Sequence, residues 1–299
     1  MNRRDFLKLT IASGLLASCD RWKAGDNVGL ALGGGGARGL AHILMLEVLD
    51  ELQISPRQIA GTSIGAVIGT MYAAGMSAQD IRKLVDQLTV SESESWLGSL
   101  FEQDVGRWWD FIELRFGRGG LIDTEAFANF IEQTIGVSRF DQLTIPLKVV
   151  AADFWQHGQV VFESGRLRPA IQASIAIPGL FIPLQYRGRV LVDGGLVNPV
   201  PYDLLFENCD VVIAVDVSGN RRPKSVDGPG YFETIFNTMQ ITQSAILREK
   251  MKQRPPHIYV RPELEDIRVL DFNRVDEIYQ QSRSARDKLR IALRQYFPT

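Results

Sequence analysis

The sequence predicts an α/β protein whose mainly parallel sheet is covered by helices on both faces, forming a three-layer sandwich. Short apolar runs typical of strands alternate along the chain with stretches of helical periodicity, which is the order that parallel sheets require. Glycine-rich turns follow the first two apolar runs, at 33–39 and 61–65. The 299 residues are 45% apolar and 23% charged, which suffices for a sizeable core.

Each predicted element follows from a local pattern. Apolar runs predict strands, and apolar residues three or four positions apart predict helices. Ser77–Asp80 has the pattern of a capping box ahead of a further helix. The predicted strands are 28–32, a run from 58 into Ser63, 147–152, a hairpin arm at 159–163, 189–192, 211–217 and 258–260. The predicted helices are 40–52, 66–74, 124–135, 231–253 and a terminal helix from about 273.

Residues 1–18 resemble a twin-arginine lipoprotein signal peptide. Arg3 and Arg4 begin an R-R-x-F-L-K pattern, an apolar stretch follows, and small residues precede Cys19 as in a bacterial lipobox. We therefore expect cleavage before Cys19, acylation of its thiol and a linker over 19–27. The alternative is a plain N-terminal helix that contains a cysteine by chance.

The expected lipid anchor defines an expected location. Asp20 resembles an inner-membrane retention signal, so we expect an exported protein at the periplasmic face of the bacterial inner membrane. Contact with the membrane surface would come from the acyl chains, because each buried methylene contributes roughly 0.8 kcal/mol. The net charge of −2 gives no reason to expect nucleic acid as a partner.

The rest of the chain is expected to form a catalytic domain over 28–218 and an extension over 219–299 that packs on the same domain. Residues 91–120 interrupt the α/β rhythm with six aromatic residues and five glycines, and we interpret them as an inserted flap. Cys209 precedes a strong strand and is predicted to be a packed core thiol.

Two glycine-framed motifs carry the chemistry. Residues 61–65 have the G-x-S-x-G pattern of a nucleophile elbow, a sharp strand-to-helix turn that exposes the Ser63 hydroxyl. Residues 33–39 offer backbone N–H groups for an oxyanion at another strand-to-helix junction. The alternatives are a helix cap for Ser63 and a dinucleotide site for the glycine loop. A dinucleotide site needs an acidic residue after the second strand, whereas Asp50 and Glu51 end the first helix.

A nucleophilic serine also needs a base. The chain has three histidines, His42, His157 and His257, and none follows the order serine, acid, late histidine of α/β hydrolases. Asp193 is the other candidate, because it ends a predicted strand at the edge where active-site groups of parallel sheets gather. Burial would raise the pKa of this carboxyl toward the working range. From these residues alone, a simple turn aspartate is an equal interpretation.

The motifs together resemble the patatin-like phospholipase family over roughly 28–218. The resemblance implies a serine–aspartate dyad that works without histidine. It is carried by G-G-G-x-R-G at 34–39, G-x-S-x-G at 61–65, D-G-G at 193–195, and supporting segments at 173–181 and 198–201.

The resemblance implies a role for each motif residue. Ser63 is the expected nucleophile and Asp193 the expected general base of an acyl-ester hydrolase that acts on phospholipid or lysophospholipid. Arg38 is expected to shape the oxyanion loop. No metal or cofactor is expected, and the alternative is a lipid-binding or regulatory module without activity. The expected oxyanion residues are Gly34, Gly35 and Gly36, and the remaining motif glycines are Gly39, Gly61, Gly65, Gly194 and Gly195.

Overall fold

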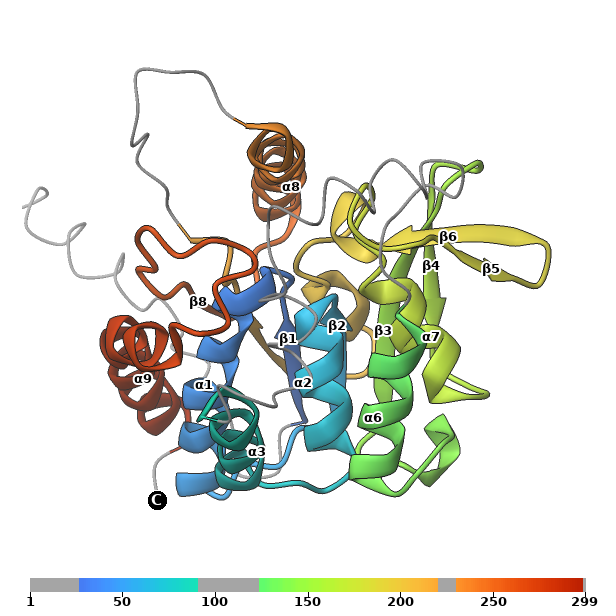
Figure 1. Cartoon of the computed structure of the whole chain (residues 1–299). Coiled ribbons are helices and arrows are strands. Elements are labelled where there is room, and N and C mark those ends of the chain that lie inside the picture. Colours follow the sequence, from blue (N-terminus) through green and yellow to red (C-terminus); the bar gives the residue numbers. More distant parts are fainter. Residues whose placement is uncertain (1–26, 91–123, 220–229, 298–299) are drawn as a thin grey trace, which may run out of the picture.

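A computed structural model of the chain describes residues 27–90, 124–219 and 230–297 (Figure 1). Three expected features lie outside the described residues: the signal peptide at 1–18, Cys19 and the aromatic insertion at 91–120. Of the expected linker over 19–27, only the last residue is described. Within the described ranges, no helix is both long enough and apolar enough to cross a membrane.

One mixed sheet of eight strands forms the centre of the described part (Figure 1). Five of its strands, β3, β2, β1, β7 and β8, are parallel, which confirms the predicted fold class. Each strand is hydrogen-bonded to the next in the series β5 (Leu184–Tyr186), β6 (Arg189–Asp193), β3 (Leu147–Asp153), β2 (Gln58–Thr62), β1 (Val28–Leu32), β7 (Val211–Val215) and β8 (Ile258–Val260), and β4 (Gly158–Phe162) is also paired to β3.

The direction of β6 differs from that of the five parallel strands. The strand predicted at 189–192 exists, but it runs antiparallel to β3 instead of with the parallel strands. Its direction follows from a hairpin, because Arg187 and Gly188 both have positive φ, at 49° and 75°, and reverse the chain after β5. A short apolar run does not encode its direction in a sheet, and β5 itself was not predicted.

The helices agree with the predicted ones, except that α7 was not predicted. At the start of α3, the Ser77 hydroxyl accepts a hydrogen bond from the Asp80 N–H and donates one to the Asp80 carboxylate. The helices are α1 (Ala41–Glu51), α2 (Ile64–Ala73), α3 (Ala78–Val90), α6 (Glu125–Ile135), α7 (Leu167–Ser174), α8 (Tyr231–Gln253) and α9 (Val275–Tyr296).

The two faces of the sheet pack against different layers. Leu30 on β1 points into the large core shared with α1, α2 and α9, whereas the next residue, Ala31, points to the opposite face. That second face is covered by the 3₁₀ helix η5 (Tyr202–Leu205), Cys209 and, from α8, Leu247. Burial raises the pKa of the Cys209 thiol to about 11, so the predicted core thiol is confirmed.

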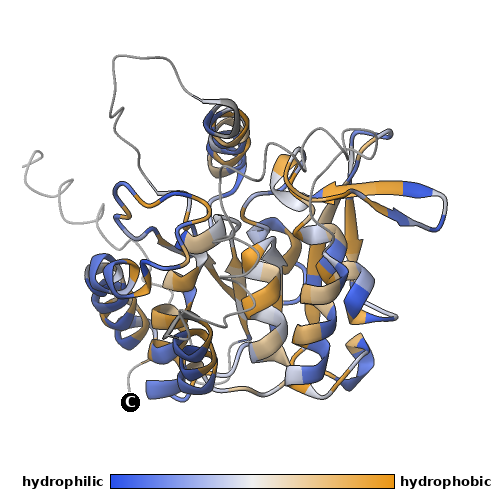
Figure 2. Cartoon of the chain, viewed as in Figure 1, coloured by the Kyte–Doolittle hydropathy of each residue, from blue (hydrophilic) through white to orange (hydrophobic). Residues whose placement is uncertain are grey.

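The C-terminal part of the chain adds to the same sheet and core. Strand β8 pairs with β7, and α9 lies against α1, where the Arg290 guanidinium forms an ion pair with Glu51 at 2.9 Å. Figure 2 shows the strands mostly in hydrophobic colours and the outer surfaces of α3 and α9 mostly in hydrophilic ones. Hydrophobic burial therefore holds these outer helices through one face each.

Candidate active site

Ser63 occupies a sharp turn between β2 and α2. Its φ of 54° and ψ of −127° lie in a region that non-glycine residues rarely adopt, so the surrounding structure must hold the turn in place. The flanking glycines permit this turn because a side chain at either position would clash with nearby backbone atoms. A Cβ on Gly65 would lie 2.2 Å from the Leu32 carbonyl oxygen, and one on Gly61 would lie 2.6 Å from the Ala66 Cα. This is the geometry of a nucleophile elbow.

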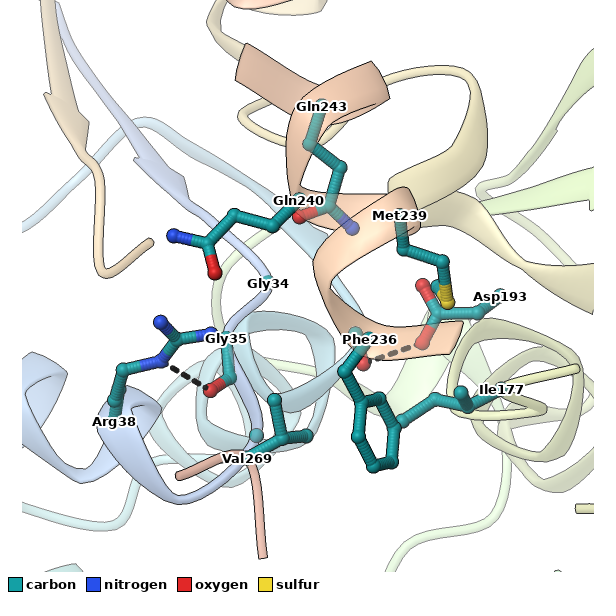
Figure 3. Close-up of a pocket in the computed structure, with 12 residues that line it drawn as sticks. Gly34, Gly35, Arg38, Ile177, Asp193, Phe236, Met239, Gln240, Gln243 and Val269 are labelled. Carbon is teal, nitrogen blue, oxygen red and sulfur yellow. Dashed lines mark hydrogen bonds between the residues drawn. The ribbon is translucent and has the colours of Figure 1, made fainter. Parts of the chain in front are cut away.

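Asp193 lies beside Ser63 because β2 and β6 run toward each other along the same edge of β3 and end at adjacent positions. Strand β2 runs along this edge as far as Val150, and β6 runs back along it and ends opposite Ala151. Strand β4 occupies the other edge of β3. The Ser63 Oγ consequently donates a hydrogen bond to the Asp193 Oδ2 at 2.7 Å (Figure 3).

The carboxyl group of Asp193 is almost completely shielded from solvent. The residue is 2% exposed, and its Oδ1 accepts a hydrogen bond from the Gly195 N–H at 2.7 Å. Burial raises the pKa of Asp193 to about 6, against the lowering effect of the Ser63 and Gly195 hydrogen bonds. The neighbouring Gly194 lets the chain pass close to the backbone of β3, since a Cβ there would lie 2.3 Å from the Val150 carbonyl oxygen.

Ser174 on α7 connects the elbow to the sheet, and sequence reasoning missed it. Its hydroxyl accepts a hydrogen bond from the Ser63 N–H at 2.8 Å and donates one to the Val150 carbonyl at 2.7 Å. Ser174 is fully buried. Ser174 therefore links the strained turn at Ser63 to Val150, the β3 residue that lies opposite the end of β2. The sequence signal that could have identified Ser174 is its position in the 173–181 segment, which supports the family resemblance.

The glycine loop follows β1 and lies beside the elbow. The Gly34 N–H, an expected oxyanion donor, already donates a hydrogen bond to the Pro199 carbonyl at 3.0 Å. The N–H groups of Gly35 and Gly36 have no acceptor among the described residues. A Cβ on Gly36, whose φ is 59°, would lie 2.2 Å from the Val269 carbonyl oxygen, so this tight loop requires glycine there.

Arg38 holds the glycine loop from within. The side chain is 4% exposed, and its Nε donates to the Gly35 carbonyl at 3.2 Å while its Nη1 donates to the Ser218 carbonyl. It thereby links the loop after β1 to the segment after β7. Gly39, one residue further, lets the loop approach α2, because a Cβ there would lie 2.2 Å from the Ile64 Cγ2.

None of the three histidines hydrogen-bonds to Ser63. His42 is fully buried, and its Nε2 lies 2.8 Å from the Gly33 carbonyl oxygen. Burial lowers the pKa of His42 to about 4, so the ring is neutral at pH 7 and donates this bond. The His257 Nδ1 accepts a bond from the Val212 N–H, and His157 lies in the β3–β4 turn.

Helix α8 supplies much of the wall of the pocket that contains Ser63 and Asp193 (Figure 3). Its contributing residues are three or four positions apart, which places them on one face of the helix. The sequence predicts the helix at 231–253, but no pattern in it singles out this face. The residues are Phe236, Met239, Gln240 and Gln243, and Ile177 and Val269 complete the wall with the motif residues.

The segment after the D-G-G motif supports both loops of the site. The Asn198 carbonyl accepts a bond from the Thr62 hydroxyl at 2.8 Å, next to the Pro199 carbonyl that holds Gly34. The C-terminal half of α8 fixes this segment, because the Lys250 Nζ donates to the Asn198 Oδ1 at 2.5 Å and to the Val200 carbonyl at 2.9 Å. In the described residues, no group of three His, Cys, Asp or Glu side chains is placed to hold a metal ion.

The fold and this geometry define a class of α/β protein with a serine–carboxylate pair beside a glycine loop. The sequence model of the patatin-like phospholipase family matches residues 30–206, more than half of the chain. The chain belongs to the patatin-like phospholipase family.

Comparison with curated proteins gives the same family relationship. An uncharacterized NTE family protein of Mycobacterium bovis is 33% identical over 228 residues, which cover 76% of this chain and 59% of that protein. The lysophospholipase NTE1 of Saccharomyces cerevisiae is 28% identical over 301 residues, covering 93% of this chain and 17% of the yeast protein. The match thus spans less than two thirds of the length of each of these relatives.

Among solved structures, VipD from Legionella pneumophila is similar with a TM-score of 0.47 and 14% identity, covering 89% of this chain and 68% of that one. The type III effector protein ExoU is similar with a TM-score of 0.45 and 14% identity, covering 92% of this chain and 54% of that one.

Proposed function

We propose that this protein is a serine acyl-ester hydrolase that acts on membrane-derived lipids, of the phospholipase A or lysophospholipase type. The observation that carries the proposal is the 2.7 Å hydrogen bond from the Ser63 Oγ to the buried Asp193 carboxylate. Family membership supports a lipid ester as the substrate. The related yeast protein named a lysophospholipase supports a lysophospholipid in particular.

In the proposed first step, the Ser63 Oγ attacks the ester carbonyl carbon and passes its proton to the Asp193 Oδ2. A carboxylate with an ordinary pKa is a weak base for a hydroxyl. Burial raises the pKa of Asp193 to about 6, so the group is still ionised at pH 7 while its affinity for the proton is increased. The tetrahedral intermediate then collapses, the C–O bond breaks, and the leaving alcohol takes the proton from Asp193.

The oxyanion of that intermediate would be bound by the N–H groups of Gly35 and Gly36. Both amides are without a protein acceptor in the described structure, so no existing hydrogen bond has to break first. A well-placed donor of this kind contributes about 3–4 kcal/mol to transition-state stabilisation. Water then attacks the acyl-enzyme with Asp193 again as the base, which releases the fatty acid and restores Ser63.

A fluorophosphonate probe tests the proposal directly. We expect the probe to label the wild-type protein at Ser63, with the modified peptide identified by mass spectrometry, and the protein to release fatty acid from lysophosphatidylcholine. Ser63→Ala should lose both signals. Ser164→Ala, a change in an exposed loop, is the matched control and should retain both. A wild-type protein that neither reacts with the probe nor cleaves the lipid would instead be a binding module without activity.

A further inference from the structure

A second cleft lies next to the pocket of Ser63. About 350 Å³ of it has room for water-sized molecules, compared with about 30 Å³ of the pocket itself. One wall is the N-terminal half of α8, which contributes Glu233, Phe236, Asn237 and Gln240. The opposite wall is the segment 267–271, which lies between β8 and α9.

The cleft and the Ser63 pocket adjoin each other. Phe236 and Gln240 from α8, Val269 from the opposite wall and Arg38 line both of them. Figure 3 shows Phe236 and Val269 facing one another at this boundary. The larger cleft therefore begins directly beyond these two side chains, within reach of a long chain whose reacting group lies at Ser63.

The surface of the cleft is mainly apolar. Val269 and Leu270 pack with Phe236 and Met239 in a small hydrophobic cluster that is separate from the main core, and these four side chains remain partly exposed. Ile267 forms the buried floor. Partly exposed apolar side chains facing one another across a cleft are typical of a site for an apolar ligand.

The charged residues that line the cleft are two arginines, Arg38 and Arg268, and two carboxylates, Glu233 and Asp271, so the cleft has no net positive charge that would attract a phosphate headgroup. The buried Arg38 guanidinium already donates to the Gly35 and Ser218 carbonyls. The Asp271 carboxylate accepts bonds from the Arg268 N–H at 2.8 Å and the Arg274 Nη1 at 3.2 Å, so the Arg274 guanidinium offsets its charge. Glu233 adds a second carboxylate to the same rim.

We propose that this cleft binds the fatty acyl chain of the ester whose carbonyl carbon is attacked by Ser63. The inference rests on the proposed function, because it assigns the acyl part of that substrate to a named surface. Each methylene transferred from water into the cleft contributes to binding, so the cleft sets a preference for long acyl chains. Leu270 and Asn237 line the cleft but not the Ser63 pocket, which makes them the residues with which to change this preference.

The test compares kcat/KM for p-nitrophenyl laurate and p-nitrophenyl butyrate, both below their aggregation concentrations. We expect the wild type to prefer laurate. Leu270→Trp and Asn237→Trp, made separately, each fill part of the cleft and should lower the laurate-to-butyrate ratio at least tenfold. Ile241→Trp is the matched control, because Ile241 is on the same helix and 71% exposed, and it should leave the ratio at the wild-type value. Ratios that stay unchanged in both cleft variants would overturn the proposal.

A binding measurement separates failure of this inference from failure of the proposed function. Fluorescence polarisation of BODIPY-labelled hexadecanoic acid is measured with the Ser63→Ala protein, with and without each cleft substitution. We expect binding to weaken at least tenfold in both cleft variants and to persist with Ile241→Trp. Equal binding in all variants would refute the acyl cleft even if hydrolysis is observed. Hydrolysis of neither ester would reject the proposed function, and the binding result would still decide the role of the cleft.

Discussion

The two halves of the sheet differ in how they contribute to the site. The parallel half, with β1 and β2, places the glycine loop and Ser63 at the carboxyl ends of neighbouring strands. The antiparallel half delivers Asp193 from the opposite direction, at the end of β6. Both halves are needed because the Ser63–Asp193 pair forms where two opposed strands end on β3.

From this difference we expect the two parts of the proposed dyad to respond differently to substitution. Ser63 depends on backbone strain that glycines and Ser174 hold in place. Asp193 depends on burial, which disfavours its charge and is compensated only in part by two hydrogen bonds. We expect changes in the parallel half to disturb geometry and changes at Asp193 to disturb the proton equilibrium.

The largest expected effect is that of Asp193→Asn on activity. Asparagine cannot accept the Ser63 proton, so kcat/KM for lysophospholipid should fall by about 10³-fold or more. The double variant Ser63→Ala/Asp193→Asn should be no less active than Ser63→Ala alone, because the two groups act as one unit. Losses that multiply in the double variant would show that the two residues act independently.

Although Asp193→Asn should lower activity, it should not lower the free energy of unfolding at high pH. The folded-state pKa of about 6 exceeds the ordinary 3.8, so the folded protein binds the proton more tightly and the free energy of unfolding falls as pH rises from about 4 to about 6. The full difference amounts to roughly 3 kcal/mol. Urea denaturation at pH 8 should find Asp193→Asn at least as stable as the wild type.

The pH profile of activity provides a further check on the same group. Wild-type kcat/KM should decline below about pH 6, as Asp193 becomes protonated and can no longer act as a base. An acid limb near pH 4, with a less stable Asp193→Asn protein at pH 8, would mean that burial does not raise this pKa.

Ser174→Ala should have an intermediate effect. It leaves the buried Ser63 N–H and the Val150 carbonyl without their partner, which costs about 1–3 kcal/mol of stability. We expect kcat to fall about 10- to 100-fold with little change in KM, since the nucleophile loses its fixed position. Thr70→Ala is the matched control: it removes a buried hydroxyl that bonds to the Ala66 carbonyl and should lower stability without this loss of kcat.

His42→Asn should have the smallest effect. His42 bonds to the Gly33 carbonyl and not to Ser63, so the change affects only the support of the glycine loop. We expect kcat/KM to fall less than tenfold and the acid limb to stay near pH 6. Loss of that limb in His42→Asn would assign it to the histidine and exclude Asp193 as its source.

Much of the fold was predictable because each half carries strong local patterns. The parallel strands are short buried apolar runs, α3 begins with the Ser77–Asp80 capping pattern, and α9 has a clear amphipathic periodicity. The hairpin of β5 and β6 was not predictable in this way, because Arg187 adopts a positive φ without being glycine or asparagine. Ser174 was missed for a related reason, since its two bonds join α7, the elbow and β3.

The sequence by itself determined the parallel core, the elbow turn and the glycine loop, because those depend on residues close together in the chain. Glycines at 61 and 65 are required by contacts within one strand–turn–helix unit and the strand beside it. Only the tertiary structure decided that Asp193 hydrogen-bonds to Ser63, that the Gly34 N–H bonds to the Pro199 carbonyl, and that α8 forms a wall of the site. These facts depend on strand direction and on contacts between distant segments, which are set by the packing of the whole sheet.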